Sequence, residues 1–175
     1  MAPVFRFHVW NDMHVRALAP GQANPVHPLG NERALWALEC ALGRQGLAAP
    51  DFVVGAGDLI NTGLPTDTAN FGSMMLARLP VPFLPCPGNH EILMQGEDDP
   101  PDLGRSPWPG QAWRNYVFTR GGIGFIVVDT SRGQDTDTPA AANRNEFLQR
   151  AFARLAGMPA FVLTHMPLIP LREKE

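Results

Sequence analysis

Four short motifs carry the side chains of this sequence that are best suited to metal binding and acid–base catalysis. In chain order they are Asp12-Met13-His14, Gly57-Asp58, Gly88-Asn89-His90-Glu91 and Thr164-His165-Met166-Pro167. Each motif follows a short apolar run that is typical of a buried β-strand. Carboxylate, imidazole and amide groups delivered from successive strand ends are the ligands that a two-metal hydrolytic site needs. The sequence therefore predicts such a site.

Each motif also has a simpler interpretation when it is taken alone. Asp12 and His14 would lie on the same side of an extended backbone and could share one divalent ion, but Asp and His also pair in ordinary loops. Asp58 could bridge two ions, yet Gly-Asp is common in turns. Asn89 and His90 could be ligand and acid, or part of an Asn-containing turn. The prediction therefore depends on all four motifs occurring together and in this order.

Apolar runs and turn residues predict the elements that position these motifs. We expect strands over residues 4–10, 51–54, 83–86, 116–118, 123–128 and 160–163, and helices over 31–43, 66–79 and 144–155. Strands and helices alternate in the first half, which favours parallel βαβ units. Gly121-Gly122 joins two later strands as a hairpin. The Pro- and Gly-rich loop over residues 95–110 is where we expect substrate contacts.

The composition indicates one globular domain spanning residues 1–175, with 45% hydrophobic and 18% charged residues. A net charge of −3 provides no basic face, so nucleic acid is not an expected partner. Cys40 and Cys86 cannot form a disulfide framework, which favours a reducing compartment. The sequence starts without a signal-peptide pattern and has no apolar run near the roughly 20 residues of a membrane span. We therefore expect a soluble, cytoplasmic protein.

Taken together, the four motifs resemble those of the calcineurin-like metallophosphoesterase family, and the resemblance covers almost the whole chain. It implies an α/β fold, a four-layer α/β/β/α sandwich with two mixed sheets. It also implies a hydrolase of a small phosphoester, either a monoester or a diester, that uses a hydroxide bridging two divalent metal ions. Mixed oxygen and imidazole ligands suit Mn, Fe or Zn.

The resemblance also implies a role for each motif residue. Asp12 and His14 would hold the first metal, and Asp58 would bridge both metals. Asn89 and His165 would hold the second metal. His90 would act on the leaving group, with Asn61 as the residue that orients it.

Three departures from the family pattern affect these expectations. Many relatives have an acidic residue three positions after the bridging Asp, where this chain has Asn61, so we expect a less stabilised His90 imidazolium. Thr62 and Gly63 follow where protein phosphatases have an Arg, which favours the cyclic-nucleotide phosphodiesterase and general phosphoesterase branch. The family's Gly-His-x-His motif does not follow His165, which leaves each metal one imidazole short. We therefore expect a domain truncated at its C-terminus, with an incomplete second sheet.

Two other functions are consistent with the sequence. One is a catalytically impaired remnant that serves as a binding module, which would explain the missing histidines. The other is a DNA exonuclease of the same fold, although the net negative charge of the chain argues against DNA binding. Among the remaining residues, we interpret His8 as structural, His27 as a solvated loop residue and Cys86 as packing. The sequence predicts no oligomeric state.

Overall fold

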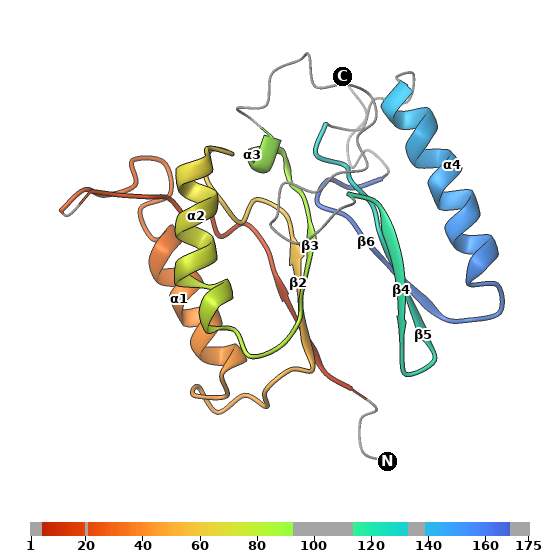
Figure 1. The fold of residues 1–175 in the computed structure, drawn as a ribbon, viewed down its shortest axis with the longest axis horizontal. Helices are drawn as coiled ribbons and strands as arrows, with labels where there is room; N and C mark the ends of the chain where they lie inside the picture. Colours follow the sequence, from red (N-terminus) through yellow and green to blue (C-terminus); the bar gives the residue numbers. More distant parts are fainter. Residues whose placement is uncertain (1–4, 20, 93–113, 133–138, 169–175) are drawn as a thin grey trace, which may run out of the picture.

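The computed structural model describes residues 5–19, 21–92, 114–132 and 139–168. The predicted loop over 95–110 lies outside these residues. The elements are β1 (Phe7–Trp10), α1 (Gly30–Ala41), β2 (Phe52–Ala56), α2 (Pro65–Met74), the 3-10 helix η1 (Leu76–Arg78), β3 (Phe83–Cys86), α3 (Asn89–Ile92), β4 (Tyr116–Arg120), β5 (Ile123–Val127), α4 (Pro139–Arg154) and β6 (Ala160–Leu163). They form two three-stranded sheets with helices on the outer faces (Figure 1). The predicted α/β fold with two sheets and flanking helices is confirmed.

The first sheet has the order β1-β2-β3, with both pairs parallel. Helices α1 and α2 cover its outer face (Figure 1), as βαβ connections require. Val53 points to the helix side and packs with Leu38 and Phe71 in one apolar cluster. Phe52 and Val54, one residue either side of it, point to the other face, which is the alternation expected of a strand buried on both faces.

The second sheet has the order β4-β5-β6 and is the mixed one, because β4 and β5 form the predicted antiparallel hairpin while β5 and β6 are parallel. Helix α4 covers its outer face (Figure 1). Ile126 and Val128 pack there against Ala151 and Leu155. Mixed pairing was predicted for both sheets; in the described part of the first sheet the pairing is parallel throughout.

A cluster rich in phenylalanine fills the space between the two sheets. Phe7 stacks on Phe52 with ring centroids 5.3 Å apart, and Phe118 stacks on Phe125 at 4.6 Å. Cys86 is fully buried at the same interface, and its thiol contacts the carbonyl of Val128 at 3.3 Å. Burial raises the pKa of this thiol, so its predicted role in packing agrees with the structure.

Some helix details differ from the predictions. Asn31, where the predicted helix begins, makes no capping hydrogen bond on α1; its side chain exchanges two hydrogen bonds with the backbone of Arg16. Leu35 is 36% exposed, whereas Ala34, Leu38 and Ala41 are buried in the cluster that includes Val53 of β2. Phe152 on α4 is likewise exposed, although it is a large apolar residue of the predicted helix over 144–155. The segment predicted as one helix over 66–79 divides into α2 and η1.

Candidate metal centre

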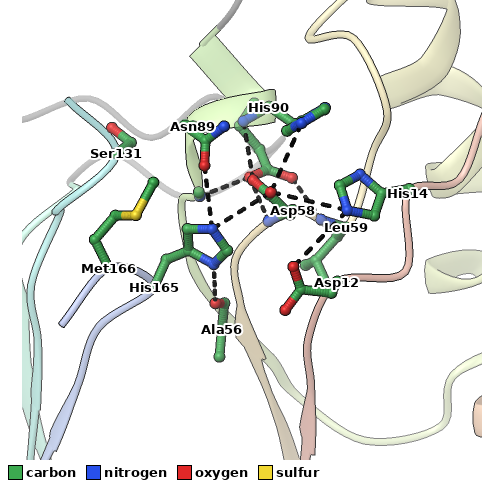
Figure 2. Close-up of polar contacts among 12 residues, drawn as sticks. Asp12, His14, Ala56, Asp58, Leu59, Asn89, His90, Ser131, His165 and Met166 are labelled. Carbon is green, nitrogen blue, oxygen red and sulfur yellow. Dashed lines mark hydrogen bonds and ion pairs between the residues drawn. The ribbon is translucent and has the colours of Figure 1, made fainter. Parts of the chain in front are cut away.

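Loops at the ends of four strands bring the predicted site residues together (Figure 2). Asp12 lies two residues after β1, Asp58 two after β2, and Asn89 three after β3. Because these strands are parallel neighbours, their carboxyl ends meet at one edge of the sheet. His165 follows β6 by two residues and reaches the same place from the second sheet.

The loops that carry Asp12, His14 and Asp58 have an unusual backbone. All three residues have a positive φ of 50°, in the left-handed region that costs a non-glycine residue about 1–2 kcal/mol. The two loops hold each other in this shape: the N–H of Asp12 donates to the carbonyl of Gly57 at 3.1 Å, and the N–H of His14 donates to that of Asp58 at 2.9 Å. Such conformations persist only where the surroundings enforce them, and they concentrate at functional sites.

Glu91 is the main positioning residue that the sequence did not reveal. Its side chain is fully buried in α3 and accepts four backbone hydrogen bonds. One carboxylate oxygen accepts from the N–H groups of Asp58 (2.8 Å) and Gly88 (2.6 Å), and the other from those of Leu59 (2.7 Å) and Ile60 (3.1 Å). Burial raises the pKa of Glu91, and these N–H donors act in the opposite direction. The carboxylate thus fixes the loop that presents Asp58.

Two glycines are required for the close approach of these loops. A Cβ atom on Gly88 would overlap with the backbone nitrogen and Oδ1 of Asp58. Gly57 has a φ of 93°, and a Cβ there would lie 2.6 Å from ring atoms of His165. The glycines of both motifs therefore allow backbone to pack directly against the candidate ligands.

Asp58 lies at the centre of the cluster (Figure 2). Its Oδ2 is 3.4 Å from Nε2 of His165 and 3.9 Å from Nε2 of His14. Nε2 of His165 is also 3.2 Å from Oδ1 of Asn89, and Nε2 of His14 is 3.8 Å from Oδ1 of Asp12. Two pairs of predicted ligands thus lie on two sides of one shared carboxylate.

These spacings fit the metal ions that the fold implies. Two ligand atoms that each lie about 2.1 Å from a tetrahedral ion are about 3.4 Å apart. Within the described part of the chain, two groups of three side chains have ligand atoms within 4.8 Å of one another: His14 with Asp58 and His90, and Asp12 with Asp58 and His165. Asp58 belongs to both groups. The grouping places His90 with His14 and Asp12 with His165, whereas the sequence predicted that Asp12 and His14 share one ion and that His90 binds none.

The charge states of the cluster follow from its burial and contacts. Burial lowers the pKa of His14, and the neighbouring His27 and His90 add to this effect, so His14 is held as the neutral imidazole that can ligate. The hydrogen bond to Asp58 raises the pKa of His165 to about 8. Burial alone would raise the pKa of Asp58, but hydrogen bonds from His165 and from the His90 backbone lower it.

His90 contacts Asp58 and Asn61, but not in the way the sequence predicted. Its backbone N–H donates to Oδ1 of Asp58 at 2.9 Å, and its ring Nδ1 lies 2.6 Å from the main-chain carbonyl oxygen of Asn61. We expected the Asn61 side chain to orient His90; its Oδ1 is instead buried without a hydrogen-bond partner among the described residues. The orienting group is a carbonyl that any residue would supply.

His27 is also placed differently from its prediction as a solvated loop residue. It is half-buried, and its ring lies face to face with that of His14, with centroids 3.6 Å apart and an interplanar angle of 2°. Its ring centroid is 6.1 Å from that of His90. The spacing of His27 in the sequence gave no signal of this contact, which depends on how the loop folds back.

The two sheets bring carboxylate, amide and imidazole groups together at their strand ends, and these are the groups that metal-dependent hydrolases use as ligands. The sequence model of the calcineurin-like phosphoesterase family matches residues 5–174, and the chain belongs to this family. Among solved structures, the chain is similar to purple acid phosphatase PPD1 from yellow lupin (Lupinus luteus) seeds, with 17% identity and a TM-score of 0.46. The match covers 85% of this chain and 27% of that one. The sequence matches no curated protein.

Within the described residues, no helix combines the length and the apolar character needed to cross a membrane.

Proposed function

We propose that the protein is a phosphoester hydrolase that uses two divalent ions, Mn, Fe or Zn, held around Asp58. The main support is the position of the Asp58 carboxylate, within 4 Å of imidazole nitrogens from two other loops. Such ions, when bound, lower the pKa of water to give a nucleophile at neutral pH and neutralise charge on the phosphoryl oxygens. Asp12 and His14 would hold one ion, and Asn89 and His165 the other.

The protein's own groups then position and protonate the substrate. If the Nδ1 of His90 donates to the Asn61 carbonyl, the ring orientation is fixed and Nε2 faces the cluster, 3.9 Å from Asp58. We propose that His90, as the imidazolium, donates its Nε2 proton to the departing oxygen and keeps its Nδ1 proton on the Asn61 carbonyl, which is general acid catalysis worth about 10²–10⁴ in rate. Asn61 contributes through its backbone carbonyl.

The substrate that we propose is a small phosphomonoester or phosphodiester. The net charge of −3 does not favour a nucleic-acid strand, which argues against the exonuclease alternative. The two cysteines are free and buried, which is compatible with the proposed cytoplasmic location.

The test combines metal analysis with turnover. Purified protein loaded with Mn²⁺ and freed of excess ion should retain two ions per chain and hydrolyse nitrophenyl phosphate or bis-nitrophenyl phosphate. Asp58→Asn should lose at least one ion and about 10²-fold or more of the activity, because an amide cannot bridge two cations. Asp51→Asn, at an exposed carboxylate away from the cluster, is the matched control and should change neither.

Two results would contradict the proposal in different ways. Retention of one ion without turnover would favour the binding-module alternative. Retention of no ion, together with no turnover of either ester, would remove the hydrolase assignment.

A further inference from the structure

We infer that His27 is a positioning residue, which holds the His14 imidazole in its ligating orientation by stacking on it. This inference rests on the proposed metal role of His14. The two rings lie face to face, with centroids 3.6 Å apart and planes within 2° of parallel. A flat neighbour at this distance prevents the His14 ring from rotating out of its plane.

His14 lacks the usual means of fixing a ligating ring. Metal-binding histidines generally donate their second ring nitrogen to a carboxylate, a carbonyl or water, and this bond sets the ring orientation. Nδ1 of His14 is buried and has no hydrogen-bond partner among the described residues. The rings of His27, face to face, and His90, edge-on at 4.5 Å, supply the restraint instead. Of the two, only His27 covers the face of the ring.

The loop that carries His27 is itself tied to His14. Asn24 is 2% exposed, and its Oδ1 accepts hydrogen bonds from the N–H groups of Val26 (3.1 Å) and His27 (3.0 Å). Its Nδ2 donates to the carbonyl of His14 at 3.3 Å. A Cβ on Gly30 would lie 2.7 Å from the same carbonyl, so the end of this loop also sits against the His14 backbone. The backbone contacts of this loop therefore place His27 beside His14, and the stacked geometry does not depend on the His27 side chain alone.

The same geometry argues against His27 as a ligand. The lone pair of an imidazole nitrogen lies in the plane of its ring. An ion in the plane of His14, bound at Nε2, would lie out of the parallel plane of His27. His27 accordingly acts through His14 rather than on the ion.

Three variants test this role by the affinity for Mn²⁺, measured by calorimetry on the full chain. His27→Ala removes the ring and should weaken Mn²⁺ binding about tenfold, the lower end of what loss of a supporting group costs. His27→Phe keeps a flat ring without nitrogens and should stay within about twofold of the wild type. His8→Ala, on β1, is the matched control and should bind as the wild type does.

Two outcomes would overturn the inference. Unchanged affinity in His27→Ala would show that stacking is not needed. Equal losses in His27→Ala and His27→Phe would show that the nitrogens of His27 matter, as they would for a ligand.

A second readout on the metal-free protein separates this inference from the proposed function. A wild type that binds no Mn²⁺ would contradict the metal role of the cluster. In that case the NMR signals of the His14 ring protons, measured at fixed pH, still show whether His27 stacks on His14. They should move in His27→Ala, through loss of the ring current, and move little in His27→Phe; signals that stay in place in His27→Ala would overturn the inference.

Discussion

Replacing Glu91 by Gln keeps the size of the side chain but removes its charge. It also replaces one of the two acceptor oxygens by an NH₂ group, which can only donate hydrogen bonds. Whichever way the new amide is turned, its NH₂ group faces two backbone N–H donors that an oxygen now accepts from. These donors are buried, and each unsatisfied donor costs about 1–3 kcal/mol. The expected loss in the free energy of unfolding is therefore about 2–6 kcal/mol, a large part of the 5–15 kcal/mol of a typical domain.

Urea denaturation followed by circular dichroism measures this loss directly. Glu32→Gln, at an exposed position on α1, makes the same chemical change without buried partners and should stay within about 0.5 kcal/mol of the wild type. A Glu91→Gln variant as stable as Glu32→Gln would refute the conclusion that this carboxylate organises the Asp58 loop.

The other predictions concern backbone packing and proton release. Gly88→Ala should cost several kcal/mol or displace Asp58, because the added Cβ overlaps with that residue. Gly72→Ala, on α2 with open space around it, should stabilise the protein by up to about 1 kcal/mol; equal effects of the two changes in thermal melts would be contrary to this account. Metal must displace the proton from His165, whose pKa is raised to about 8, so Mn²⁺ affinity should rise about tenfold from pH 7 and level off above pH 8. Calorimetry in buffers of different ionisation enthalpy would detect the released proton. A Mn²⁺ affinity independent of pH between 7 and 9 would contradict the displacement of a proton from His165.

The strands, and the residues that meet at their ends, could be predicted from sequence because their signals are local. β3 and β6 begin and end at the predicted residues, since turn residues bracket short apolar runs. On α1, Leu38 is fully buried but Leu35 is 36% exposed, while the small residues Ala34 and Ala41 are buried, so apolar spacing alone does not define the buried face.

The supporting residues of the site depend instead on contacts between distant segments. Glu91 bonds to backbone groups more than 30 residues away, and nothing in a four-residue helix marks its acid as buried. The carbonyl of Asn61 replaces the expected side-chain contact. His27 reaches His14 only through a loop that Asn24 folds back. Such roles have no spacing rule in the sequence.

The proposed centre requires that two cations share the carboxylate of Asp58. Crystals of the protein soaked in Mn²⁺ and measured at a wavelength with manganese anomalous scattering test it most directly. Two anomalous peaks about 3.5–4 Å apart are expected, one on each side of Asp58. An Mn²⁺-saturated crystal without a peak in bonding distance of that carboxylate would contradict it.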